Sequence, residues 1–155
     1  MRQTTICFFI KDDSILLAMK KRGHGVNKWN GVGGKAEPGE TIEQTAIREA
    51  QEEIGLTPRK LKKVAKITFI FPPERDFDHE STAFLCEEWD GEPAETEEMK
   101  PQWFAIKDIP YEYMWDSDTR WLPKILQGKL IVASVRSTAS NGMAKYDERE
   151  VASLD

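Results

Sequence analysis

The sequence predicts an α/β (α+β) sandwich in which helices cover a sheet of mixed strands. Three observations support this fold class. The chain has 155 residues, which suits one domain over 1–155 with a sizeable core. Strand-like apolar runs recur along the chain without a clear linker, and two helix-like segments lie among them. Strands mixed with few helices are typical of a layered α/β fold.

The N-terminal part is predicted to contain a hairpin, a glycine-rich loop and a helix. Apolar runs at 6–10 and 15–19 flank a polar turn, as the strands of a β-hairpin do. Residues 23–39 include seven Gly or Pro, which favours a structured loop. The helix is predicted over 41–54, because Thr41 and Gln44 fit a capping box and Gly55 follows as a stop signal.

The C-terminal part is predicted to add more strands and a second helix. Strands are expected at 64–71, 81–88 and 102–106. The second helix is expected over 119–127, where Pro123 is tolerable only near the first turn. The last two strands, 130–138 and 143–151, flank Asn141-Gly142 and are predicted to form a closing hairpin, because Asn-Gly favours a tight turn.

The composition excludes several classes of protein. Asp and Glu number 27 against 22 Lys and Arg, and this net charge of −5 argues against a stable complex with long nucleic acid. No apolar run approaches the ~20 residues of a membrane span, so no membrane partner is expected. The N-terminus lacks the apolar core of a signal peptide, which predicts a cytoplasmic location. Cys7 and Cys86 are expected to be buried free thiols.

Three carboxylates share one face of the predicted helix 41–54. Glu49, Glu52 and Glu53 are spaced by three and four residues or adjoin one another, so their charges repel. A hard divalent cation such as Mg²⁺ would remove that penalty, because it prefers carboxylate oxygens. A solvated acidic face is the ordinary alternative. The glycines just upstream, within 29–35, favour the metal interpretation, because they let the backbone approach a phosphate chain and its cation closely.

Together these residues resemble the Nudix box of the Nudix hydrolases. Gly34, Glu40 and the run 48–56 match its pattern over residues 34–56, with no departure at the charged or glycine positions. The resemblance implies a Nudix-type α/β/α sandwich around a central mixed β-sheet. It also implies hydrolysis of a nucleoside diphosphate linked to another group, with Mg²⁺ as cofactor and Mn²⁺ as a substitute.

The resemblance extends over nearly the whole chain. Residues 19–23, 28–35, 97–104, 114–118 and 149–151 are similar to the MutT-homologue branch of this family. That branch hydrolyses oxidised purine nucleoside triphosphates of the 8-oxo-dGTP type to the monophosphate and pyrophosphate, which sanitises the nucleotide pool and protects DNA. The expected partner is therefore a small nucleotide substrate, and the expected assembly is a monomer.

The resemblance also assigns roles to individual residues. It makes metal ligands of the Gly33 carbonyl and of the carboxylates Glu49, Glu52, Glu53 and Glu98. Glu49 or Glu53 serves as general base, and Arg48 can orient a carboxylate through a bidentate pair. The matching substrate-contact positions are Thr5, Lys20, Asn30, Gly33, Gly34, Lys35, Phe69, Phe71, Trp115, Ser117 and Asp118.

Three of these residues have the chemistry that a purine needs. Trp115 can stack on a base, Asn30 offers both a donor and an acceptor, and Asp118 accepts from ring N–H groups or donates when protonated. Each also has a structural interpretation: a core tryptophan, a turn asparagine, and a helix N-cap shared among Asp116, Ser117 and Asp118.

The chain departs from the branch at a few positions. Ser117 replaces one of two adjacent acids, Asp116 replaces a proline, and His24 replaces a phenylalanine. Two acids in different protonation states let one pocket read oxidised guanine and oxidised adenine, so losing one predicts a preference for oxidised guanine.

Other functions stay open at this point. The alternatives are a Nudix hydrolase of another nucleotide, such as a dinucleoside polyphosphate, capped RNA or nucleoside triphosphates in general, and a nucleotide-binding regulator without catalysis. The net charge conceals strong local fields: residues 34–56 and 87–98 carry −4 and −7, whereas 18–30 and 57–66 carry +4 and +5. Part of the acidity therefore fits a cation site beside a lysine-rich entrance.

Overall fold

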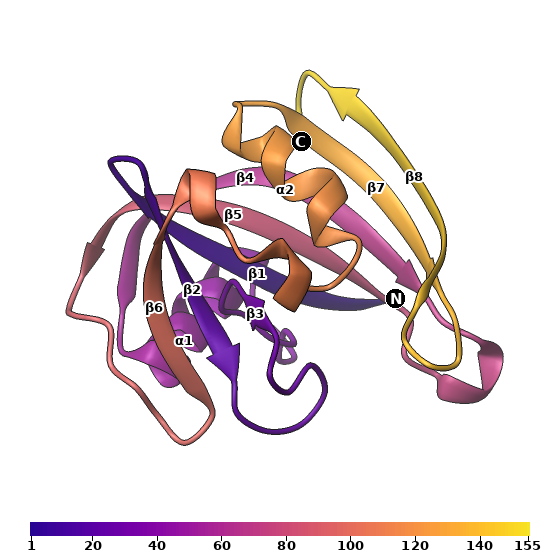
Figure 1. Ribbon diagram of the computed structural model, residues 1–155, viewed down its shortest axis with the longest axis horizontal. Helices are drawn as coiled ribbons and strands as arrows, with labels where there is room; N and C mark the ends of the chain where they lie inside the picture. The colour runs from indigo at the N-terminus through magenta and orange to yellow at the C-terminus, as the bar shows by residue number, and fades with distance from the viewer.

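Eight strands of the computed structural model, which describes all 155 residues, form one mixed sheet in the order β3-β2-β1-β5-β4-β7-β8, with β6 paired to β2 (Figure 1). Pairs β1–β5 and β4–β7 are parallel, and the other pairs are antiparallel. The strands are β1 (Arg2–Lys11), β2 (Ser14–Lys20), β3 (Trp29–Asn30), β4 (Thr57–Ile70), β5 (His79–Asp90), β6 (Met99–Ala105), β7 (Leu130–Ser137) and β8 (Met143–Val151).

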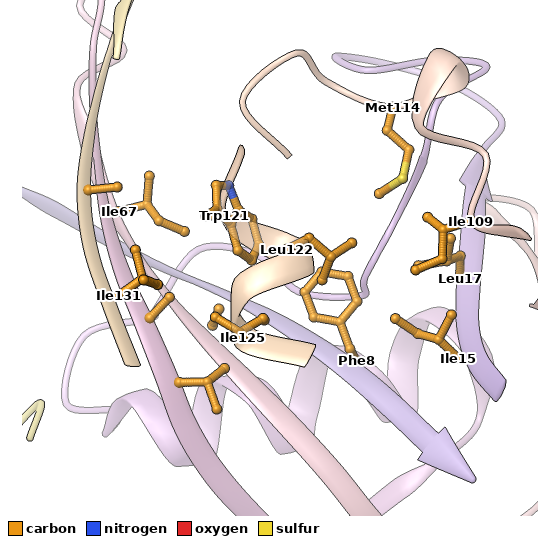
Figure 2. Packing of buried hydrophobic residues seen from close by; sticks show 14 of the residues in the cluster. Phe8, Ile15, Leu17, Ile67, Ile109, Met114, Trp121, Leu122, Ile125 and Ile131 are labelled. Carbon is orange, nitrogen blue, oxygen red and sulfur yellow. The ribbon is translucent and has the colours of Figure 1, made fainter. Parts of the chain in front are cut away.

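Helices α1 (Ile42–Ile54) and α2 (Asp118–Leu126) cover opposite faces of this sheet (Figure 1). Adjacent residues of a strand point to opposite faces, and on β1 Cys7 packs in the cluster of α1 whereas Phe8 packs in the cluster of α2. Figure 2 shows Trp121, Leu122 and Ile125 of α2 beside Phe8. The predicted α/β/α sandwich around a mixed sheet is therefore confirmed.

Strand β2 separates from β1 after a few residues, and this separation opens the sheet. Only Ser14, Ile15 and Leu16 pair with β1, whereas the whole of β2 pairs with β6. The glycine-rich loop runs along the freed edge of β1: the N–H of Thr5 donates to the carbonyl of Gly34 at 2.9 Å, and Cys7 and Val32 exchange two backbone hydrogen bonds. The loop is thus held against β1 by backbone hydrogen bonds.

The first helix has the ends that the sequence predicts. The Thr41 side chain accepts from the N–H of Gln44 at 3.1 Å, and the Gln44 side chain accepts from the N–H of Thr41 at 2.9 Å. Gly55 ends the helix with φ of 76°, a left-handed conformation that glycine adopts without strain. Both cysteines are free and buried, as predicted.

Several other expectations need correction. The loop 23–39 contains the two-residue strand β3, and β4 begins at Thr57 instead of residue 64 because its basic residues pair with β5. Helix α2 begins at Asp118, so Pro123 lies in its second turn rather than near its first. No side chain caps this helix through a hydrogen bond, although Ser117 is at the N-cap position.

The closing hairpin and the short helical turns complete the chain. Strands β7 and β8 pair antiparallel, as predicted, but the connection between them is a five-residue turn over 138–142 and not a tight two-residue turn. Three 3₁₀ turns are found at η1 (Pro73–Arg75), η2 (Ile106–Asp108) and η3 (Tyr111–Tyr113). None of the helices combines the length and the apolar character that a membrane crossing requires.

Candidate active site

The three glutamates of α1 differ sharply in exposure. The side chain of Glu52 is 60% exposed and that of Glu49 is 17% exposed, whereas Glu53 is only 5% exposed. The N–H of Gly33 donates to Glu53 Oε1 at 3.1 Å. The second oxygen, Glu53 Oε2, is buried and accepts no hydrogen bond. A buried carboxylate oxygen without a partner is costly, so this atom favours the approach of a cation.

Arg48 ties the acidic residues of this region together. Its Nε and Nη2 donate to Glu40 at 2.7 and 3.0 Å, which forms a bidentate pair. Its Nη1 donates to Glu49 Oε1 at 2.9 Å and to Glu52 Oε2 at 3.3 Å. The hydrogen bond from Arg48 lowers the pKa of Glu40 to about 2. Arg48 therefore fixes where two of the three helix carboxylates point.

Burial and mutual repulsion act on the two less exposed acids. Burial raises the pKa of Glu53, and the neighbouring charge of Glu49 raises it further. Burial also raises the pKa of Glu49, although Arg48 partly offsets this effect. Two carboxylates in a poorly solvated place favour a proton or a cation between them, because either one removes the repulsion.

The donor set fits a hard divalent cation. Besides the glutamate oxygens, the Gly33 carbonyl accepts no hydrogen bond within the protein, so its oxygen is free to bind a ligand. All these donors are oxygen atoms, which Mg²⁺ and Mn²⁺ prefer over softer metals. No three acidic, His or Cys side chains converge into a preassembled metal centre, however. Glu49 and Glu52 are held by Arg48 instead.

Glycine is required at Gly31 and Gly33, where a side chain would meet the backbone of β1, and at Gly34 a side chain would displace the Glu49 carboxylate. A Cβ atom on Gly33 would lie 1.8 Å from the carbonyl oxygen of Thr5, and one on Gly34 would lie 2.5 Å from the carboxylate of Glu49. Both distances are far below van der Waals contact. The absence of a side chain thus lets the loop pack simultaneously against β1 and against the carboxylates.

Glu98 lies apart from the other predicted metal ligands. Its carboxylate is 55% exposed and pairs with Arg22, with 3.3 Å between Oε1 and Nη2. No hydrogen bond or ion pair connects it to the carboxylates of α1. Its segment is attached to the helix nearby, because the Thr96 hydroxyl donates to the carbonyl of Glu53 at 2.9 Å. The role of Glu98 as a metal ligand therefore stays a prediction.

A cavity of about 240 Å³ opens where β2 separates from β1, and residues of both hydrophobic clusters, such as Met99 and Val135, line it. Ten of the predicted substrate contacts line it: Thr5, Lys20, Asn30, Gly33, Gly34, Phe69, Phe71, Trp115, Ser117 and Asp118. The exception is Lys35, which is exposed and contributes only its carbonyl, as an acceptor for Arg48. The volume suits one heterocyclic base better than a whole nucleotide.

The polar end of the cavity has hydrogen-bonding groups to spare. Asn30 Oδ1 accepts from the N–H of Gly31 at 2.8 Å, which leaves its amide N–H groups unpaired. Asp118 Oδ2 accepts from the N–H of Trp115 at 3.1 Å, and the other oxygen makes no hydrogen bond. Burial raises the pKa of Asp118 to about 7. The hydroxyl of Ser117 is also unpaired, so three adjacent side chains can bond a ligand.

Aromatic rings form the opposite wall, and several of them were not predicted. Phe71 and Phe77 lie 5.0 Å apart between ring centroids, and His79 stacks on Phe69 at 4.9 Å. Phe77 and His79 precede and begin β5, and no sequence motif distinguishes them from core residues. Lys28, whose ammonium lies 4.9 Å from the Trp115 ring centroid, was noted only as part of a basic segment.

Lys20 lies between the carboxylates and the cavity. Its charge lowers the pKa of Glu53 on one side and that of His24 on the other, although burial is the larger influence on each group. Its side chain forms no hydrogen bond or ion pair within the protein. A cation between an acidic face and a base-sized cavity is well placed to bind a phosphate chain that connects the two.

Comparison with known proteins agrees with this geometry. A model of the NUDIX domain matches residues 1–125, which include the glycine loop, α1 and the predicted box.

The chain belongs to the Nudix family.

Two relatives of this Nudix chain match over nearly their full length. It is 41% identical over 150 residues to "Oxidized purine nucleoside triphosphate hydrolase" of Danio rerio, and the match covers 97% of this chain and 96% of the relative. It is 40% identical over 155 residues to the protein of that name in Mus musculus, and the match covers 99% of this chain and 97% of the relative. The crystal structure of a MutT protein from Bacillus halodurans matches with a TM-score of 0.81 and 25% sequence identity. The match covers 96% of this chain and 97% of that one. The chain is thus a Nudix hydrolase, a class that generally needs a divalent metal.

Proposed function

We propose that this Nudix hydrolase acts on oxidised purine nucleoside triphosphates of the 8-oxo-dGTP type and sanitises the nucleotide pool. The observation that carries the proposal is the position of a base-sized cavity with unpaired polar groups beside the carboxylate face of α1. The relatives of nearly full length, whose names describe hydrolases of oxidised purine nucleoside triphosphates, support this substrate class.

We further propose Mg²⁺ as the cofactor, with Mn²⁺ as a substitute. Glu49, Glu52, Glu53 and the Gly33 carbonyl would hold it, because all are oxygen donors and two of them, Glu53 Oε2 and the Gly33 carbonyl, accept no hydrogen bond. When bound there, the cation would neutralise charge that builds up on the phosphoryl oxygens during hydrolysis. Glu98 would join these ligands only if its pair with Arg22 opens.

The chain's own residues contribute binding, orientation and proton transfer. The base enters the cavity against Trp115, and Lys20 holds the phosphate chain over α1. One water is consumed, the anhydride bond between the α- and β-phosphates breaks, and the monophosphate and pyrophosphate leave. The proton that the water loses passes to Glu49 or Glu53, whose raised pKa values make them better bases than an exposed glutamate. Arg48 keeps Glu49 aimed at this position.

The polar end of the cavity selects the base. Asp118, when ionised, accepts from the two donors on the Watson–Crick edge of a guanine-type base, while Asn30 donates to an acceptor on the base. The Ser117 hydroxyl either donates or accepts, so it tolerates either kind of group. These contacts favour oxidised guanine nucleotides, and oxidised adenine nucleotides would need Asp118 in its protonated form.

A substrate panel tests the proposal. The purified protein is incubated with Mg²⁺ and with 8-oxo-dGTP, dGTP, 2-oxo-dATP, a dinucleoside polyphosphate or capped RNA, and products are separated by ion-exchange chromatography. We expect 8-oxo-dGMP and pyrophosphate to form fastest. Equal rates for 8-oxo-dGTP and dGTP would contradict the proposal. Glu43→Gln is a matched control on α1, since Glu43 pairs with Lys63 away from the site and should leave the rate unchanged.

We also propose that residues 1–155 act as one domain and as a monomer. The two helices pack on opposite faces of one sheet, so the chain forms a single folded unit. Light scattering at assay concentration checks the assembly, and a dimer mass would contradict it.

A further inference from the structure

His24 occupies a slot between two aromatic walls of the cavity. Its imidazole stacks on Trp115 with 4.9 Å between ring centroids and an interplanar angle of 21°. It also meets Phe77 edge-on, with 5.0 Å between centroids and an angle of 76°. The protein therefore places one of its own flat heterocycles against the tryptophan that is proposed to stack on the substrate base.

The ring lies on the cavity side of Trp115. His24 lines the base-sized cavity together with Trp115 and Phe77. A second, more open hollow also borders Trp115, but His24 is not among its lining residues. A base that stacks on the face of Trp115 covered by His24 must therefore take the space of the imidazole, whereas Lys28, whose ammonium lies 4.9 Å from the ring centroid, borders both hollows.

No room exists for both rings. Stacked aromatic pairs have centroids about 4.5–7 Å apart, and the His24–Trp115 pair is already near the lower end of that range. Inserting a purine between them would roughly double the separation. The imidazole must leave Trp115 before a base can cover it.

His24 is attached weakly enough to move. Its ring nitrogens make no hydrogen bond within the protein, and the residue is exposed to solvent. It sits in the connection between β2 and β3, between Gly23 with φ of 83° and Gly25 with φ of 85°. Two neighbouring glycines in the left-handed region allow backbone rotation that other residues resist. Aromatic contacts with Trp115 and Phe77, and no hydrogen bond, hold the ring in the slot.

We propose that His24 is an internal occupant of the base subsite, which the substrate base displaces from Trp115. This inference rests on the proposed function of the cavity as the base subsite. Only molecules in which His24 has left the slot can bind a base on Trp115. The measured affinity for a nucleotide is therefore the intrinsic affinity multiplied by the fraction of such molecules. An aromatic pair such as His24 and Trp115 stabilises the closed slot only modestly. Removing the imidazole should therefore tighten nucleotide binding by about two- to tenfold.

Binding of the product 8-oxo-dGMP, measured without metal, tests whether removing the imidazole tightens binding. We expect His24→Ala to lower the Kd, measured by calorimetry, by about two- to tenfold, whereas His24→Phe, which still stacks, should not lower it. Val26→Ala is the matched control in the same loop, because Val26 is 45% exposed and does not line this cavity. Weaker or unchanged binding by His24→Ala, or equal tightening by Val26→Ala, would overturn the proposal.

A second measurement uses the unaltered protein. The chain has only two histidines, so its imidazole proton signals are few and are assigned by their loss in the variants. In the free protein, the ring current of Trp115 should shift the His24 signals upfield. Saturating 8-oxo-dGMP should return them toward the free imidazole position, and pyrophosphate alone should not. His24 signals that stay upfield at saturation would refute displacement.

The two proposals fail in distinguishable ways. If the substrate panel shows no preference for oxidised purine nucleotides and 8-oxo-dGMP binds no better than dGMP, the proposed function is wrong. If the panel gives the expected preference while the His24 signals stay in place, only the displacement of His24 is wrong.

Discussion

The buried carboxyl of Asp118 predicts a specific pH dependence of stability. This side chain is 2% exposed, and burial raises its pKa to about 7, against an ordinary value of 3.8. The hydrogen bond from the N–H of Trp115 and the charge of Lys28 lower this pKa, and the nearby Asp116 raises it, but burial has the largest effect. Between these two pH values the folded state binds a proton that the unfolded state has already lost. The contribution of Asp118 therefore falls as the pH rises through this range.

The size of the effect follows from the shift. Stability changes by about 1.36 kcal/mol per pH unit for one proton, and the range from pH 5 to the folded pKa covers about two units. We therefore expect Asp118 to remove about 2–3 kcal/mol of stability between pH 5 and pH 8. Above pH 8 the loss is complete, because the group is ionised in both states.

The variant Asp118→Asn isolates this contribution. Asparagine has nearly the same shape and still accepts from the N–H of Trp115, but it cannot ionise. The free energies of unfolding of both proteins are measured by urea denaturation at several values between pH 5 and pH 8. The variant should gain stability relative to the wild type as the pH rises, by about 2–3 kcal/mol in total.

The difference between the two proteins matters more than either curve alone, because Glu49 and Glu53 also titrate with raised pKa values and contribute equally to both. A difference that stays constant within about 0.5 kcal/mol across the range would refute the argument that Asp118 is protonated in the cavity at low pH. A difference of opposite sign would show that Asp118 is stabilised as an anion.

Three further predictions concern catalysis and packing. Glu53→Gln should lower kcat at least ~100-fold while the circular dichroism spectrum is unchanged, because it removes a carboxylate from the cation and proton-transfer face; near-normal turnover would contradict its role. Gly34→Ala should reduce activity strongly, since its Cβ would lie 2.5 Å from the Glu49 carboxylate. Gly39→Ala is the control, because a Cβ there would have nothing within 4 Å. Its positive φ of 83° should cost only about 1 kcal/mol of stability in thermal melts, and the rate should be unchanged. Trp115→Ala should raise KM for 8-oxo-dGTP by about ten- to hundredfold with a smaller effect on kcat, because base stacking is lost; an unchanged KM would mean that the base lies elsewhere.

Local signals were sufficient for the elements whose ends depend on neighbouring residues. The capping box of Thr41 and Gln44 and the left-handed Gly55 place α1 correctly, since these hydrogen bonds span only three or four positions of the chain. The N-terminal end of β4 was missed. Its lysines read as a polar segment, and their strand conformation comes from pairing with β5, about 25 residues further along the chain.

The cavity shows the same division between local and long-range information. Trp115 and Asn30 were predicted because their chemistry suits a purine and their neighbours resemble a family motif. Phe77 carries no such motif, and its ring reaches the cavity because the connection between β4 and β5 brings it beside Phe71. Glu98 was predicted as a ligand from its segment, yet in the structure it pairs with Arg22.

Residue types and their local spacing predict the family, the carboxylate face of α1 and the glycines that lie against it. These properties depend on residue type and on spacing along a helix and loop, which one stretch of chain contains completely. The tertiary structure decided which atoms are unpaired and which rings share a slot. Glu53 Oε2 lacks a partner, and His24 covers Trp115. Both residues lie near the place where β2 separates from β1 and where loops distant in the sequence meet at one cavity. Such contacts arise from burial and long-range pairing, which spacing in the sequence does not encode.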